Sequence, residues 1–211
     1  MQKELLYLCA AIAGYLLGNV QCAVILSRLK YHDDVRNHGS GNAGSTNMLR
    51  VFGLKPGLVT FVGDFLKGVL GVLIGRWIAG ETGGYISALF TVLGHDFPAF
   101  LGFKGGKGVA ASFGIVWVLN PLYGAIITAV AVIAMWAFKT VSIVSLIGVT
   151  TYLVLTLCFS WDNTQMVVLI VILWALIVIR HAENIRRICK GEEGKLFGNK
   201  KAESEKQEPQ G

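Results

Sequence analysis

Long apolar runs are the feature that most constrains how this chain can fold. Several are close to the roughly 20 residues that an α-helix needs to cross the core of a bilayer. The runs cover residues 5–26, 57–79, 85–103, 109–138, 141–159 and 165–179. Of the 211 residues, 54% are hydrophobic and 15% are charged, which is more apolar than an ordinary soluble domain. The pattern predicts an all-α polytopic membrane bundle, and it excludes a soluble two-domain enzyme and a disordered chain.

The run over residues 109–138 decides the expected topology. As one helix it would extend about 45 Å, well beyond the hydrocarbon core. Asn120-Pro121 interrupts it near the middle, and proline breaks helices. Splitting the run returns the basic residues after Arg180 to the side of the earlier basic loops, as the positive-inside rule favours. We therefore expect seven transmembrane helices, with the N-terminus outside and the C-terminus cytoplasmic.

The first apolar run is expected to be retained rather than cleaved as a signal peptide. Lys3 and Glu4 leave no net positive charge before it, and the basic residues Arg28 and Lys30 follow it. Residues 1–199 are expected to form a single integral membrane domain. Residues 200–211 are polar and mixed in charge, so they are expected to be a disordered cytoplasmic tail.

The net charge and the cysteines limit which partners and which kinds of site the chain can have. A net charge of +6 and a pI near 9.2 are compatible with nucleic-acid binding, but in so apolar a chain they indicate basic loops facing anionic lipids. We expect no nucleic-acid partner. The four cysteines form no C-x-x-C pair, which argues against a disulfide framework or a zinc site.

The first of three polar clusters covers residues 39–50. Its small residues suit a tight turn that exposes backbone N–H groups to an anion, and Arg50 offers a planar fork for phosphate. The candidate phosphate-binding residues here are Ser40, Gly41, Asn42, Thr46, Asn47 and Arg50. The alternative is a plain flexible turn. The Gly-Lys-Ser/Thr ending of a P-loop is missing.

The second cluster covers residues 94–108. Its candidates are Lys104, Gly105, Gly106 and Lys107, where glycines around two lysines suit close approach to an anion. The alternative is a basic loop next to the membrane that simply obeys the positive-inside rule. His95 falls within an apolar run, where an ionisable group is functional by default, although a hydrogen-bonded structural histidine remains the alternative.

The third cluster covers residues 180–187, at the end of the last apolar run. His181 and Asn184 are three residues apart and share a helix face. The alternative is a basic helix end that interacts with lipid headgroups. Asp64 and Lys67 also share a face, and we interpret them as an intramembrane ion pair that stabilises the bundle. Together the clusters describe a basic, donor-rich pocket for more than one phosphate.

These motifs resemble those of the bacterial acyl-phosphate–glycerol-3-phosphate acyltransferase family. They read GSGNAGSTNMLR from Gly39, GHDFPAFLGFKGGKGVA from Gly94 and RHAENIRRICKG from Arg180. The resemblance implies a seven-helix enzyme of the inner membrane whose active site faces the cytoplasm. It would make lysophosphatidic acid from acyl phosphate and glycerol 3-phosphate for phospholipid biosynthesis, with no metal, cofactor or coenzyme A. An enzyme that produces acyl phosphate would be a functional partner, and membrane lipids would surround it.

The resemblance also assigns residues. The family's motif positions fall on Ser40, Asn42, Asn47, Arg50, Lys104, Lys107, Ser142, His181 and Asn184. His181, Lys104 and Arg50 are the expected catalytic residues. Ser45 and Ala182 depart from the usual alanine and arginine, next to charged positions rather than at them.

The chemistry leaves one question open. His181 is a candidate general base, but the departing phosphate carries a basic oxygen and can take the proton itself, with His181 only binding. We favour the second route. A transporter for an anionic metabolite is a rival, but it usually shows two similar halves. A lipid phosphotransferase would need several Asp residues for Mg²⁺, and no histidine here fits a His-x4-Asp acyltransferase motif.

Overall fold

The protein is all-helical over residues 2–196, the part that the computed structural model describes. The helices are α1 Gln2–Gly18, α2 Cys22–Tyr31, α3 Ser45–Phe52, α4 Leu54–Asp96, α5 Val109–Leu119, α6 Pro121–Phe138, α7 Val141–Phe159, α8 Thr164–Arg180 and α9 Ala182–Cys189. Two short 3₁₀ turns, η1 Val35–Asn37 and η2 Ala99–Leu101, lie in the loops. The expected all-α class is confirmed for these residues, and the predicted tail from residue 200 lies outside them.

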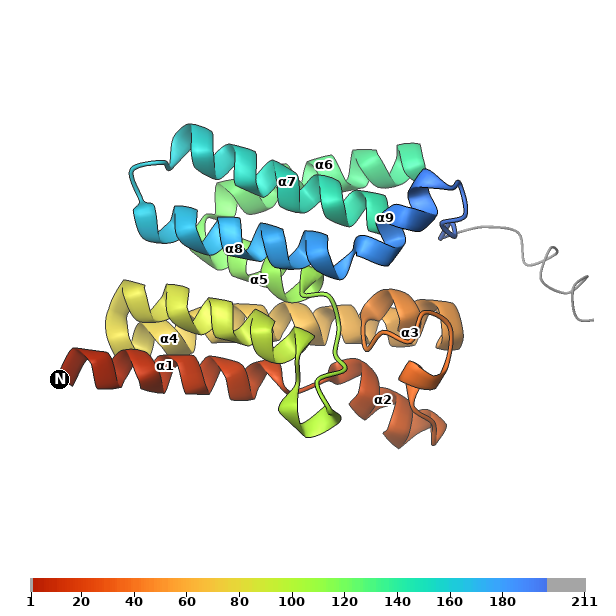
Figure 1. Ribbon diagram of the computed structural model, residues 1–211, viewed down its shortest axis with the longest axis horizontal. Coiled ribbons are helices and arrows are strands. Elements are labelled where there is room, and N and C mark those ends of the chain that lie inside the picture. Colours follow the sequence, from red (N-terminus) through yellow and green to blue (C-terminus); the bar gives the residue numbers. More distant parts are fainter. Residues whose placement is uncertain (1, 197–211) are drawn as a thin grey trace, which may run out of the picture.

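Helix α4 is a hairpin rather than one straight rod (Figure 1). Its backbone leaves helical geometry at Ala79 and at Gly80, where φ is +66°, a value that glycine adopts readily. The two arms then pack closely, since a Cβ on Gly75 would lie 2.2 Å from the carbonyl oxygen of Gly83. The apolar runs 57–79 and 85–103 predict a reversal in the gap between them, and the structure places it at the start of that gap.

The first apolar run, residues 5–26, predicts one continuous helix. The structure has two helices there instead. Helix α1 ends at Gly18 and α2 begins at Cys22. The buried Gln21 stabilises the break, because its amide donates hydrogen bonds to the carbonyl oxygens of Gly18 (3.1 Å) and His95 (3.0 Å). These bonds satisfy backbone groups that a longer helix would have satisfied internally.

The predicted break at Asn120-Pro121 is confirmed. Helix α5 ends at Leu119 and α6 begins at Pro121. Asn120 caps α6 by accepting a hydrogen bond from the backbone N–H of Tyr123 at 3.2 Å, and proline suits the first position of a helix.

The helices are those of a multi-pass membrane protein. By length and hydropathy, four helical stretches within residues 2–196 can cross a bilayer, or five if the bent α8–α9 pair is one span. The four are Gln2–Tyr31, Leu54–Leu101, Pro121–Phe138 and Val141–Phe159. Because Leu54–Leu101 contains the α4 hairpin and α5 is short, this measure gives a lower number than the seven crossings that the sequence predicts.

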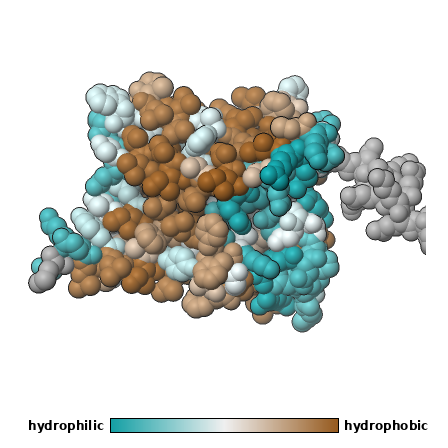
Figure 2. All heavy atoms as spheres, viewed as in Figure 1, coloured by the Kyte–Doolittle hydropathy of each residue, from teal (hydrophilic) through white to brown (hydrophobic). Residues whose placement is uncertain are grey.

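The helices form two layers with α5 between them (Figure 1). One layer holds α1 and the two arms of α4, and the other holds α6, α7 and α8. Val92, Ile115 and Ile170 belong to the apolar core where the layers meet, and all three are fully buried. Figure 2 shows a mainly apolar surface over the helices and a polar end at α2, α3 and α9.

The predicted intramembrane ion pair is confirmed. Asp64 and Lys67, one turn apart on the first arm of α4, are almost completely buried, and Lys67 Nζ lies 2.9 Å from Asp64 Oδ1. Lys67 also donates a hydrogen bond of 2.8 Å to the carbonyl oxygen of Val20, in the break between α1 and α2. The pair therefore ties α4 to the chain reversal beside it.

Candidate active site

The first polar cluster folds around the side chain of Asn47, which is buried in the first turn of α3. Its Nδ2 donates to the carbonyl oxygens of Val35 and His38, each at 3.0 Å, and its Oδ1 accepts from the N–H of Ser40 at 2.9 Å. Gly39 passes close to this amide at a φ of +58°, and a Cβ there would lie 2.3 Å from Asn47 Oδ1. Asn47 therefore shapes the loop that carries the other polar residues.

The second cluster is held through Gly106. Its N–H donates to the carbonyl oxygen of His95 at 3.0 Å, and its own carbonyl oxygen accepts from Arg180 Nη2 at 2.8 Å and Nε at 3.2 Å. The His95 ring lies directly against it, because a Cβ on Gly106 would lie 2.0 Å from His95 Nε2. These contacts fix the backbone immediately before Lys107, and they give His95 and Arg180 a visible structural part in the site.

The first and second loops are also joined directly. Arg36 Nη1 donates to the carbonyl oxygen of Lys104 at 3.3 Å, and the N–H of Ala43 donates to the carbonyl oxygen of Gly105 at 3.5 Å. Asp34 holds the Arg36 guanidinium at 2.8 Å, and the hydrogen bond from Arg36 keeps the pKa of that carboxyl well below its usual range.

The third cluster lies at the 58° bend between α8 and α9. His181 is buried there, and its Nδ1 lies 2.8 Å from the carbonyl oxygen of Ile177. A carbonyl oxygen only accepts, so Nδ1 donates and Nε2 is left for another partner. Three residues later, Asn184 Nδ2 donates to Ser142 Oγ at 2.8 Å, while Asn184 Oδ1 accepts a bond from Lys107 Nζ.

Glu193 completes this network, and the sequence reasoning missed it. Its carboxylate accepts hydrogen bonds from Ser142 Oγ (2.5 Å), Asn184 Nδ2 (2.6 Å) and Arg187 Nε (2.7 Å). Burial opposes ionisation, but these bonds outweigh it and hold the pKa of Glu193 below its ordinary value. In the sequence, Glu193 is a carboxylate just after the last motif. Other charged residues surround it, so the sequence does not single it out.

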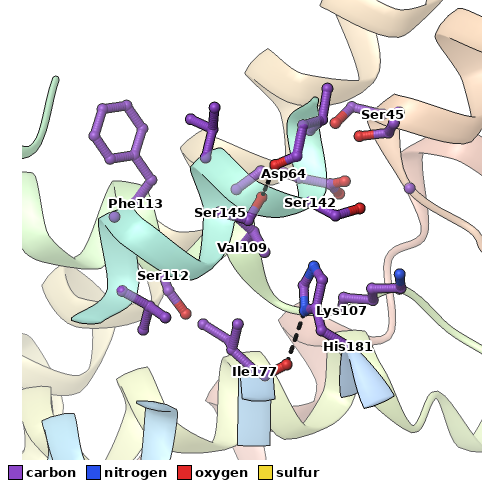
Figure 3. Close-up of a pocket in the computed structure, with 18 of the residues that line it drawn as sticks. Ser45, Asp64, Lys107, Val109, Ser112, Phe113, Ser142, Ser145, Ile177 and His181 are labelled. Carbon is purple, nitrogen blue, oxygen red and sulfur yellow. Dashed lines mark hydrogen bonds between the residues drawn. The ribbon is translucent and has the colours of Figure 1, made fainter. Parts of the chain in front are cut away.

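Lys107 is the cation at the centre of the site. It is half-buried, and burial lowers the pKa of its ammonium to about 8. Figure 3 shows Lys107 beside His181, with Ser142 facing them from α7. Arg50 lies across the mouth, exposed at the end of α3.

These residues surround one cavity of about 320 Å³, within the usual size range of small-molecule sites. Its lining includes ten of the predicted phosphate-binding residues: Ser40, Asn42, Thr46, Asn47, Arg50, Gly106, Lys107, Ser142, His181 and Asn184. Gly41, Lys104 and Gly105 are not part of the lining. The Lys104 side chain is exposed on the loop, two residues from the clamped Gly106. Asp64 and His95 reach the cavity from α4.

The cavity changes character with depth. Its mouth is polar, while its inner part runs between the two layers and is lined mostly by apolar side chains. Phe113, Val116, Ile127, Val149 and Tyr152 belong to this inner part. Within residues 2–196, no group of three or more His, Cys, Asp or Glu side chains is arranged to hold a metal ion. The arrangement suits an anionic group at the mouth and an apolar chain below it.

Comparison with known proteins identifies the family. The model of the family described as glycerol-3-phosphate acyltransferase matches residues 8–191. The glycerol-3-phosphate acyltransferase of Thermoanaerobacter pseudethanolicus is 44% identical over 88% of this chain and 93% of its own length. That of Clostridioides difficile is 38% identical over 92% of this chain and 97% of its own length.

Two solved structures share the fold. A crystal structure of PlsY (YgiH), an integral membrane glycerol 3-phosphate acyltransferase, in its glycerol 3-phosphate form is 34% identical, with a TM-score of 0.86. It covers 93% of this chain and 98% of its own. The lysophosphatidic acid form has a TM-score of 0.80 at 33% identity, covering 91% and 95%. This chain therefore belongs to the glycerol-3-phosphate acyltransferase family and is an integral membrane acyltransferase.

Proposed function

We propose that the enzyme transfers the acyl group of an acyl phosphate to the 1-hydroxyl of glycerol 3-phosphate. The products are lysophosphatidic acid and inorganic phosphate, for phospholipid biosynthesis. The observation that carries the proposal is that one cavity has both a cationic mouth and an apolar interior. A phosphorylated acyl chain has this same division of polarity. The PlsY structures in glycerol 3-phosphate and lysophosphatidic acid forms support the acceptor and the product.

The mouth offers two groups of donors for two phosphates. On one side are Ser40, Asn42 and Thr46, with Arg50 at the rim. On the other are Lys107, Ser142, His181 and Asn184. We assign the acyl-phosphate head to the first group and the phosphate of glycerol 3-phosphate to the second. Two anions can share a partly dry site only where both are matched by charge and donors.

The predicted residues that do not line the cavity, Gly41, Lys104 and Gly105, would assist binding indirectly. The Lys104 ammonium is exposed beside the mouth, where it would attract incoming phosphates by long-range electrostatics. Gly41 and Gly105 would shape the two loops. Gly105 has no space for a side chain, because a Cβ would lie 2.0 Å from the carbonyl oxygen of His95.

The reaction needs one new bond and one proton transfer. The oxygen of the glycerol 1-hydroxyl bonds to the acyl carbon, and the bond from that carbon to the phosphate oxygen breaks. The departing phosphate takes the hydroxyl proton, so no carboxylate is needed to orient His181 as a base. Because acyl phosphate is already activated, the enzyme mainly positions its substrates, and positioning alone contributes about 7–11 kcal/mol in favourable systems.

We further propose that the chain crosses the inner membrane of a bacterium seven times. The crossings are α1, the two arms of α4, α5, α6, α7 and α8, within one domain of residues 1–199. All three clusters lie at the α3 and α9 end of the molecule (Figure 1), which holds most of the basic residues and would face the cytoplasm. An enzyme that makes acyl phosphate would supply the donor from that side.

Product analysis tests this function. Purified protein is given acyl phosphate and glycerol 3-phosphate, and the lipid product is identified by mass spectrometry with assignment of the acylated position. The proposal expects 1-acyl-glycerol 3-phosphate and phosphate in equal amounts. Free fatty acid as the main product, or an acylated 2-position, would contradict it.

A further inference from the structure

The inner part of the cavity follows one face of α7. Ser142, Ser145, Gly148, Val149 and Tyr152 all line it, at the spacing of three or four residues that keeps side chains on one side of a helix. Tyr152 lies ten positions after Ser142, which corresponds to a depth of about 15 Å at 1.5 Å per residue. A bilayer core of about 30 Å gives each leaflet about 15 Å. The cavity is therefore about as deep as one layer of membrane acyl chains.

Tyr152 closes the deep end. Its side chain is 4% exposed, and its ring packs edge-to-face against the ring of Tyr123, with centroids 6.5 Å apart. The Tyr123 hydroxyl in turn lies 2.8 Å from Ser160 Oγ, at the far end of α7. Because a second, anchored aromatic ring stands behind it, Tyr152 cannot easily move away from a chain that reaches it.

Gly148 lies one turn nearer the mouth. Unlike the glycines at which two helices pack closely, it has space for a side chain. A Cβ on Gly114 would lie 2.1 Å from the carbonyl oxygen of Phe65, so close packing explains that glycine. A Cβ on Gly148 would meet only the side chain of Ile127, at an ordinary 3.6 Å. The backbone of Gly148 is helical, where glycine is unfavourable. Neither packing nor backbone geometry requires glycine here, and its effect is to leave the cavity open.

We propose that Gly148 and Tyr152 together determine which acyl chains the enzyme accepts. Gly148 leaves the passage clear, and Tyr152 sets the longest chain that fits with its phosphate at the mouth. The inference rests on the proposed function, because it takes the apolar part of the cavity as the acyl site. Gly148 and Tyr152 would contact the acyl chain and would not contact the reacting groups at the mouth.

The test compares rates across a series of saturated acyl phosphates of increasing length, at saturating glycerol 3-phosphate. In Gly148→Leu the cavity would end about one helical turn, or roughly 6 Å, nearer the mouth. We expect the longest accepted chain to shorten by several carbons. Rates with long chains should fall about tenfold or more, the usual range for misfits of a few methylenes, while the shortest chains keep rates within about twofold.

Tyr152→Ala should have the opposite effect and raise rates with chains longer than the wild-type enzyme accepts. Tyr152→Phe keeps the ring and should leave the length profile unchanged. Val154→Leu adds a methylene on α7 at a side chain that is 51% exposed outside the cavity, and it should also leave the profile unchanged. If Tyr152→Ala does not fold, Gly148→Leu and its control decide the matter alone.

The outcomes separate the two proposals. A wild-type enzyme that turns over no acyl phosphate of any length would overturn the proposed function itself. A wild-type enzyme that is active, with the same length profile in Gly148→Leu, would overturn the assignment of the length limit. An equal loss for all chain lengths in Gly148→Leu would also overturn it, because that result indicates general damage to the site.

Discussion

Asn184 and Ser142, which lie 42 positions apart in the sequence, share a hydrogen bond of 2.8 Å between Nδ2 and Oγ. The bond joins the end of the last apolar helix pair to the start of α7, at the mouth of the cavity. Lys107 from the second loop contacts the other side of the same amide. One asparagine thus links the second and third polar clusters to the start of α7.

Glu193 is expected to support substrate binding because it holds the contact between Asn184 and Ser142 in place. Its carboxylate accepts from both Ser142 and Asn184. Glu193→Ala should raise KM for glycerol 3-phosphate about tenfold or more, in line with losing hydrogen bonds to a charged group at about 1.5–3 kcal/mol each. Because the carboxylate does not touch the reacting atoms, kcat should change much less than KM.

The neighbouring Glu192 is the matched control. It is exposed, so Glu192→Ala should leave both kinetic constants within about twofold. If Glu193→Ala instead increases activity, the carboxylate competes with substrate for the site and the positioning role is wrong.

Activity should fall at alkaline pH through Lys107. Its folded pKa is lowered to about 8 by burial, so below pH 8 it is mainly a charged ammonium and above pH 8 mainly a neutral amine. A phosphate monoester is already a dianion in this range, since its second pKa is about 6. Only the protein's charge changes, and KM for glycerol 3-phosphate should rise as the pH passes about 8.

Lys107→Arg separates this effect from general alkaline damage. Arginine keeps its charge throughout the range, so the variant should bind more weakly because of its altered geometry but show a flatter pH dependence of KM. An unchanged alkaline rise in Lys107→Arg would assign the titration to another group.

His181 distinguishes the two proton routes. Its Nδ1 bonds to the backbone of Ile177, and a glutamine keeps a donor at this position. If the departing phosphate takes the proton, His181→Gln should keep more than about a tenth of the saturated rate, because a binding role affects mainly affinity. A general base contributes about 10²–10⁴-fold, so a thousandfold fall in kcat with unchanged substrate binding would identify His181 as the base.

Membrane topology is testable by cysteine labelling in a variant without the four native cysteines. Ser40→Cys and Lys195→Cys lie at the basic end and should react only after the membrane is opened. Asp162→Cys lies in the α7–α8 turn at the other end and should react in intact cells. Labelling of Ser40→Cys from outside would contradict a cytoplasmic active site.

The sequence predicts the elements whose causes are local. Pro121 marks the break between α5 and α6 because proline cannot continue a helix, and the spacing of Asp64 and Lys67 places their side chains together. The segments that carry the site are recognisable too, because polar and glycine-rich residues stand out in an apolar chain.

Features that depend on distant contacts were not predictable in this way. The break after Gly18 lies inside an apolar run, and it is stabilised by Gln21 bonding to a carbonyl of α4. Lys104 and Lys107 look equivalent in sequence, but only Lys107 lines the cavity. The clamp on Gly106 from Arg180 and His95 fixes that difference, and it involves residues from two other segments.

The acyl donor is the central claim, and one comparison of initial rates tests it. Purified enzyme receives glycerol 3-phosphate with either acyl phosphate or acyl-coenzyme A of the same chain length, with and without EDTA. We predict rapid lysophosphatidic acid formation from acyl phosphate, none from acyl-coenzyme A, and no effect of the chelator. Comparable rates with acyl-coenzyme A, or loss of the acyl-phosphate reaction on chelation, would contradict the account.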